Sequence, residues 1–231
     1  RRLTIVEKSL DQVLDEAVAE GYLTSSAASE GPAHSAGFLG FLDGGLVVRE
    51  GDGLSIPEMG DNELAVDLGT GGGVPGLVLA TLTPWRWILV DRGGRRVTFL
   101  RWAVRQLGLE DRVDVQLADA VDIASGELRG TVSLVTARGF APPGITAECA
   151  APLLVKQGVL VVSEPPETTG GGGEAHRWPA GGLSKLGLQD LGGWTSHQVA
   201  GPAGYRAMVR IGACPDRFPR RFARQMADPL F

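Results

Sequence analysis

Apolar and polar residues follow a helical rhythm near the start of the chain. Over residues 6–18, apolar residues recur every three or four positions and charged residues lie mostly on the other side, which predicts an amphipathic helix of about four turns. Gly21 is a suitable stop. Residues 25–37 have the composition of a loop or weak helix, and residues 51–62 that of a linker. We therefore expect residues 1–60 to form an N-terminal helical extension and linker.

From residue 61 onward the pattern changes to short apolar runs that alternate with helical ones. The short runs predict strands at 64–68, 87–91, 132–135 and 159–162, and an alternating run predicts one at 113–117. The clearest helical pattern between them covers residues 95–109, and another covers residues 142–156. Strands and helices that alternate in this way form a parallel sheet with helices on both faces.

Two later runs, at 194–199 and 205–211, predict a terminal antiparallel hairpin. Together with the five earlier runs they give an α/β fold with a mostly parallel, seven-stranded sheet. We expect residues 61–231 to form this one domain. It ends in a basic tail that contains Arg217, Arg220, Arg221 and Arg224.

The composition excludes several classes of protein. The chain has 231 residues, 43% hydrophobic and 21% charged, which is enough for a sizeable core. Its net charge of −5 excludes a generic nucleic-acid binder, so any contact with RNA needs a local basic surface. The two cysteines make no disulfide framework, and we expect reduced thiols in a cytoplasmic protein.

Neither a metal site nor a membrane span is expected. The three histidines are widely separated and have no metal-ligand spacing. The best apolar candidate for a span, residues 77–90, is too short and is broken by Pro84 and Arg86. We expect a monomer or a weak oligomer.

The strongest local motif is Asp67-Leu68-Gly69-Thr70-Gly71-Gly72-Gly73-Val74-Pro75-Gly76, between a predicted strand and a predicted helix. Glycines suit a backbone that turns sharply and comes close to a ligand, and Pro75 suits the first helical position. Gly69, Gly71, Gly73 and Pro75 are therefore predicted to bind a cofactor. A plain tight turn is the alternative.

Acidic residues decide which cofactor the loop favours. Asp67 precedes the glycines, where its carboxylate could meet the ammonium group of a methionine moiety. Asp91 ends the next strand and could accept hydrogen bonds from both ribose hydroxyls. Ala118 and Asp119 follow the third strand, where Asp119 could hold an adenine amino group. Because a carboxylate would repel a pyrophosphate, the set favours S-adenosylmethionine; helix capping is the alternative role for each acid.

Four motifs, taken in order, resemble one known family. Asp67 to Gly76 matches D-x-G-[ST]-G-x-G-x-P-G, and Asp91 with the following Arg-Arg-Val and Phe-Leu resembles D-S-x-x-K-R-x-x-F-L. Residues 135–138 match V-T-A-R, and residues 218–221 resemble Y-P-R-K. The chain thus resembles the bacterial 16S ribosomal RNA guanine methyltransferases of the glucose-inhibited division protein B (RsmG) type.

The resemblance implies a Rossmann-like class I methyltransferase that uses S-adenosylmethionine to methylate ring nitrogen 7 of a guanine in small-subunit ribosomal RNA. That nitrogen is already nucleophilic, so catalysis needs positioning and electrostatics rather than a general base. Arg138 is the predicted catalytic and substrate-binding residue, because it could pair with a phosphate or with the carbonyl oxygen of the base. A structural arginine is the alternative. Arg220 and Arg221 are predicted to bind the RNA backbone.

Two other functions stay open at this level. The negative charge favours a S-adenosylmethionine-dependent enzyme that acts on a small molecule or another non-RNA acceptor. The pattern Gly71-x-Gly73-x-x-Gly76 also fits a dinucleotide site. It leaves room for an NAD enzyme or a non-catalytic nucleotide-binding module.

Overall fold

A computed structural model describes residues 8–42, 58–165, 177–197 and 201–231. Within these residues, one sheet contains seven strands in the order β3-β2-β1-β4-β5-β7-β6. β7 runs antiparallel to β5 and to β6, and the pairs from β3 to β5 are parallel. The strands are β1 (Leu64–Leu68), β2 (Arg86–Asp91), β3 (Val113–Leu117), β4 (Val132–Ala137), β5 (Leu154–Glu164), β6 (Leu188–Ser196) and β7 (Ala203–Arg210). The predicted mostly parallel, seven-stranded α/β sheet is confirmed.

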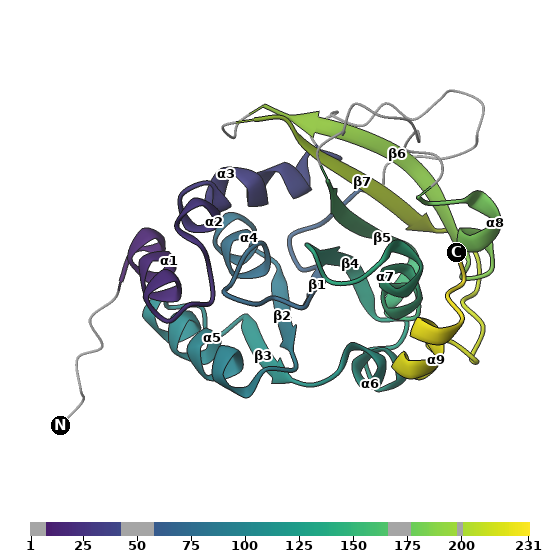
Figure 1. Cartoon of the computed structure of the whole chain (residues 1–231), viewed down its shortest axis with the longest axis horizontal. Helices are drawn as coiled ribbons and strands as arrows, with labels where there is room; N and C mark the ends of the chain where they lie inside the picture. The colour runs from purple at the N-terminus through teal and green to yellow at the C-terminus, as the bar shows by residue number, and fades with distance from the viewer. Residues whose placement is uncertain (1–7, 43–57, 166–176, 198–200) are drawn as a thin grey trace.

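The helices cover both faces of this sheet (Figure 1). Their bounds are α1 (Leu10–Ala19), α2 (Ser25–Ser29), α3 (Gly31–Ala36), the 3₁₀ helix η1 (Gly37–Leu39), α4 (Gly76–Leu82), α5 (Gly94–Gln106), α6 (Ala120–Ser125), α7 (Pro143–Ala150), α8 (Ala180–Ser184) and α9 (Phe222–Ala227). The helices α1, α4 and α5 pack on one face, and α6, α7 and α8 pack on the other. No helix in the described ranges is long and apolar enough to cross a membrane.

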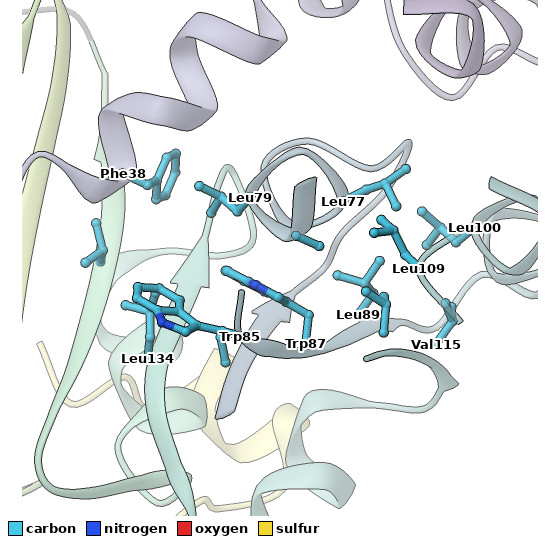
Figure 2. Close-up of a cluster of buried hydrophobic side chains, with 14 of the residues drawn as sticks. Phe38, Leu77, Leu79, Trp85, Trp87, Leu89, Leu100, Leu109, Val115 and Leu134 are labelled. Carbon is cyan, nitrogen blue, oxygen red and sulfur yellow. The ribbon is translucent and has the colours of Figure 1, made fainter. Parts of the chain in front are cut away.

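The core on the first face joins the N-terminal helices to the sheet. Figure 2 shows Phe38 from η1 and Leu77 from α4 above Trp87 and Leu89 from β2. Val13 of α1 belongs to the same cluster and is fully buried. The N-terminal helices therefore share a core with the sheet. The predicted domain boundary at residue 60 stays a prediction, because residues 43–57 lie outside the described residues.

Helix ends follow local capping chemistry. The side chain of Ser9 caps α1 in a reciprocal arrangement with Gln12, and Gly21 just after the helix has a φ of +74°. The first positions of the predicted helix, residues 6 and 7, lie outside the described residues. Residues 25–37, predicted to be a loop or a weak helix, form two short helices and the start of η1.

One predicted helix was too long. The pattern over residues 142–156 predicted a single helix, but α7 ends at Ala150 and β5 begins at Leu154. Leu154 pairs with Val132 of β4, so the sheet takes a segment whose apolar pattern fits either structure. The predicted hairpin of two late strands is confirmed by β6 and β7. Residues 198–200 of that prediction lie outside the described residues.

The strand order places a functional crevice at one point of the sheet. The chain goes outward from β1 to β2 and β3, then returns to β4 on the other side of β1. Ligands in open α/β sheets bind beyond the carboxyl ends of the strands at such a switch point. The glycine-rich loop after β1 and Arg138 after β4 both lie there.

Candidate active site

The loop after β1 turns through left-handed backbone conformations that favour glycine. Gly69, Gly71 and Gly73 have φ values of +73°, +62° and +105°. A Cβ added at Gly69 would lie 2.8 Å from the ring of Phe140. The turn itself thus requires these glycines, and their contact with a cofactor stays a prediction.

Pro75 stands just before helix α4 and not, as the sequence had predicted, at its first position. It caps α4, whose first residue is Gly76, instead of being the first helical residue itself. The peptide bond between Val74 and Pro75 is cis. The expectation for Pro75 is corrected in this respect, and its contact with a cofactor stays a prediction.

Asp67 is fully buried beneath the loop and fastens it to two neighbouring elements. Its Oδ2 accepts a hydrogen bond from the Gly76 N–H at 3.0 Å, and its Oδ1 accepts one from the Thr136 hydroxyl at 2.7 Å. A Cβ on Gly76 would lie 2.5 Å from the Asp67 side chain. This carboxylate stands where a helix N-terminus would hold a phosphate, which disfavours a dinucleotide. A direct contact between Asp67 and a methionine ammonium stays a prediction.

The buried carboxyl of Asp67 predicts a pH dependence of stability. Burial raises the pKa of Asp67 from 3.8 to about 6, although hydrogen bonds from Thr136, Thr70 and the Gly76 N–H oppose this. The native protein therefore holds this proton more tightly than the unfolded chain. The resulting stabilisation is complete below pH 3.8 and is lost as the pH rises through about 6.

We therefore expect wild type to gain free energy of unfolding relative to Asp67→Asn as the pH is lowered from about 7 to about 4. Urea denaturation of both proteins at each pH measures this difference, in which titrations shared by the two proteins cancel. Asp114→Asn is the control, because Asp114 is exposed on β3 and shows no comparable burial. If the difference in free energy of unfolding between wild type and Asp67→Asn changed as little with pH as the difference for the control, the raised pKa of Asp67 would be contradicted.

Asp91, at the end of β2, organises the other side of the loop. Its Oδ2 accepts a hydrogen bond from the Gly71 N–H at 3.0 Å, and its Oδ1 accepts one from the Gly93 N–H at 2.7 Å. Arg96 donates to Oδ1 at 2.9 Å. Burial alone would raise the pKa of Asp91, but the hydrogen bonds from Arg96, Gly93 and Gly71 outweigh it and lower the pKa. Asp91 is thus a carboxylate at neutral pH, with lone pairs left for further donors.

A cavity of about 310 Å³ opens over these loops, which is within the size range of small-molecule sites. It brings together five of the residues predicted to bind the cofactor: Gly69, Gly71, Asp91, Ala118 and Asp119. Asp67, Gly73 and Pro75 are not among its lining residues. The remaining lining comes from Tyr22, Val90, Arg92, Arg96, Ala120, Gly139, Phe140 and Phe222. The mixture of carboxylates and apolar surface suits an adenosyl group with a charged amino-acid tail.

Asp119 caps a helix and also faces the candidate cofactor cavity. Its Oδ1 caps α6 by accepting a hydrogen bond from the Val121 N–H at 2.9 Å. The residue also lines the cavity beside Ala118. Because Oδ1 caps the helix, Oδ2 is left to accept a hydrogen bond from a donor such as an adenine amino group. That contact stays a prediction.

A second cavity, of about 400 Å³, adjoins the first through Gly139 and Phe140. Arg138 lines it, half-buried at the carboxyl end of β4, and makes no hydrogen bond or ion pair with another described residue. Burial lowers the pKa of Arg138, whereas Tyr205 and Asp67 raise it. The guanidinium stays charged at neutral pH, as every arginine does. Its catalytic and substrate-binding role stays a prediction.

Arg220 and Arg221 of the C-terminal tail differ in burial and in their ion pairs. Arg220 forms a bidentate ion pair with the buried Glu148, with Nη2 and Oε2 2.7 Å apart. Arg221 is exposed, and its guanidinium makes no polar contact with the part of the chain that the structure describes. Binding to RNA stays a prediction for both, and the ion pair makes it unfavourable for Arg220.

The three aromatic residues of this cavity were missed by sequence reasoning as parts of the cofactor site. Tyr22 follows α1, Phe140 follows the V-T-A-R motif, and Phe222 begins α9. Each lies far along the chain from the glycine loop. Only Phe140 and Phe222 carried a signal, because each follows a motif shared with the family within two residues.

The fold and the site together define a class I methyltransferase: a Rossmann-like sheet with one reversed strand, and a glycine loop between two carboxylates at its switch point. The sequence matches the family described as GidB, rRNA small subunit methyltransferase G, over residues 52–164. The chain belongs to this family. The predictions of the family, of a methyltransferase and of S-adenosylmethionine as its cofactor are confirmed.

Individual relatives agree with this assignment. The chain is 34% identical over 176 residues to the ribosomal RNA small subunit methyltransferase G of Parasynechococcus marenigrum (strain WH8102), covering 73% of this chain and 68% of the relative. It is 34% identical over 163 residues to the protein of that name from Synechococcus sp. (strain CC9311), covering 67% and 61%. A putative sarcosine dimethylglycine methyltransferase from Galdieria sulphuraria is similar in fold, with a TM-score of 0.53, 12% identity, and coverage of 88% and 98%.

Proposed function

We propose that this protein transfers the methyl group of S-adenosylmethionine to ring nitrogen 7 of a guanine in the RNA of the small ribosomal subunit. Family membership supports the acceptor. The observation that carries the chemistry is the position of Arg138 in a cavity that adjoins the candidate cofactor cavity. Its guanidinium makes no hydrogen bond or ion pair with another described residue. Because ribosomal RNA lies in the bacterial cytoplasm, we propose that the enzyme acts there.

The residues divide the work between holding the cofactor and orienting the acceptor. Asp91 would accept hydrogen bonds from the ribose hydroxyls, Asp119 from the adenine amino group, and the glycine loop would pass beneath the amino-acid tail. When bound, S-adenosylmethionine supplies an electrophilic methyl group. Arg138 would donate to an oxygen of the guanine or to its phosphate and hold nitrogen 7 in line. No residue needs to remove a proton, because that nitrogen carries none.

The test is methyl transfer to defined acceptors. Purified protein with methyl-labelled S-adenosylmethionine should label small-subunit RNA, supplied naked or as subunits, and digestion should release the label as 7-methylguanosine. Label in a different nucleoside would overturn the proposed nitrogen. A protein that binds S-adenosylmethionine but labels no RNA would overturn the RNA acceptor.

The negative net charge of −5 keeps a small-molecule acceptor as the second candidate. Free guanosine triphosphate in the same assay tests whether a nucleotide alone suffices. Transfer to it at the rate seen with RNA would favour this candidate.

A further inference from the structure

The C-terminal segment folds back on α7 and is fastened there by a buried charge. Glu148 of α7 is fully buried. It accepts hydrogen bonds from the Nε and Nη2 atoms of Arg220 at 2.8 and 2.7 Å and from the Arg220 backbone N–H at 2.7 Å. A buried carboxylate without its partner is strongly destabilising. Glu148 therefore fixes both the side chain and the backbone of Arg220.

A second contact fixes the start of α9. Gln225 is fully buried, and its Nε2 donates to the Arg220 carbonyl oxygen at 2.6 Å. The thiol of Cys149, next to Glu148 on α7, donates to Gln225 Oε1 at 3.7 Å. The backbone around Arg220 and the first turn of α9 are thus held by one polar network on α7.

This network ends at the cofactor cavity. Phe222, the first residue of α9, lies two residues after Arg220 and lines the same cavity as Ala118 and Asp119. Phe222 is half-buried and packs against the apolar cluster on the α7 face. The rest of this cavity comes from Tyr22, from the end of β2 and from residues that follow β1, β2, β3 and β4. The C-terminal segment therefore adds an aromatic wall to a site that the sheet edge otherwise forms.

We propose that the Arg220–Glu148 ion pair positions Phe222 as a wall of the cofactor cavity, so that the C-terminal segment is part of the S-adenosylmethionine site. This inference rests on the proposed function for the identity of the ligand. It gives Arg220 a positioning role, whereas its neighbour Arg221 is exposed and free to meet other partners. An aromatic ring beside Ala118 and Asp119 suits an adenine, which offers a flat apolar face.

The experiment measures cofactor affinity directly. Isothermal titration of the full chain with S-adenosylhomocysteine should show about tenfold weaker binding for Phe222→Ala, roughly 1.4 kcal/mol, and near wild-type binding for Phe222→Tyr, which keeps the ring. Met226→Ala is the matched control, because Met226 is an apolar residue of the same helix whose side chain is 56% exposed. Its affinity should equal that of wild type.

The role of the ion pair needs a variant that folds. Arg220→Met alone leaves a buried charge, so the double variant Glu148→Met/Arg220→Met replaces both partners with apolar side chains. We expect its thermal midpoint to exceed that of Arg220→Met while its affinity for S-adenosylhomocysteine stays about tenfold below wild type. A double variant that folds and binds like wild type would overturn the positioning role.

The outcomes separate this inference from the proposed function. Wild-type affinity in Phe222→Ala would overturn the inference while leaving methyl transfer to RNA intact. Wild-type protein that binds the cofactor but methylates no RNA would overturn the proposed acceptor, and the effect of Phe222→Ala on binding would still stand. Wild-type protein that binds no S-adenosylhomocysteine would overturn both.

Discussion

Asp91→Ala is expected to weaken S-adenosylmethionine binding by at least about 100-fold, or roughly 2.7 kcal/mol. The substitution removes the predicted acceptor for the ribose hydroxyls. It also leaves the Gly71 N–H without its 3.0 Å partner, and Arg96 without its ion pair. Because hydrogen bonds to a charged group contribute about 1.5–3 kcal/mol each, the loss of two or three accounts for this magnitude.

Isothermal titration with S-adenosylmethionine measures the effect, with thermal unfolding as a check on the fold. Asp114→Ala is the matched control, because Asp114 is an exposed aspartate on the adjacent strand β3. Its affinity should equal that of wild type. If a folded Asp91→Ala lost less than about threefold in affinity, the assignment of this carboxylate to the cofactor would be wrong.

Arg138→Met should lower kcat/KM for the RNA acceptor by about 100- to 1,000-fold, the range seen when one donor that stabilises a transition state is removed. Methionine keeps much of the apolar stem and removes the charge. Since the guanidinium has no hydrogen-bond partner among the described residues, the stability of the fold should change little. Arg138→Lys should recover part of the rate, because it restores the charge but not the planar fork.

Methyl transfer and cofactor titration must be measured on the same Arg138 variants. Arg86→Met is the control, because Arg86 is exposed at the amino end of β2, on the opposite edge of the sheet. A variant that retains most of its kcat/KM would leave Arg138 a structural arginine. If only the affinity for S-adenosylmethionine fell, Arg138 would be assigned to cofactor binding and not to binding of the methyl acceptor.

Local patterns were sufficient for the first three strands, β1 to β3. β1 and β3 have the predicted bounds, and β2 extends the predicted run by one residue. The runs of β1 and β2 are short and apolar because both faces of the sheet are buried there. β3 lies at the edge of the sheet, and its sequence alternates buried Val113 and Val115 with exposed Asp114. Both patterns are local properties of the sequence. The helix over residues 142–156 was mispredicted because its apolar residues suit either structure, and pairing of Leu154 with Val132 chose the strand.

In the candidate site, too, some features follow from local motifs and others from contacts between distant residues. The acids, the glycines and Arg138 are short motifs at strand ends, and parallel strands bring their carboxyl ends to one edge. The sequence could not show that Asp67 accepts a hydrogen bond from Thr136, 69 positions away. That hydrogen bond depends on the pairing of β1 with β4. Nor could the sequence show that Arg220 faces a buried glutamate rather than solvent.

By itself, the sequence therefore determined the class of fold, the family and the cofactor, since these depend on periodicity and on motifs of neighbouring residues. Only the tertiary structure decided which charged side chains form ion pairs: among the described residues, Arg138 forms none, and Arg220 pairs with Glu148. It also brought Tyr22, Phe140 and Phe222 into one cavity. The physical reason is that burial and pairing are set by residues far apart in the chain, whereas patterns report only on near neighbours.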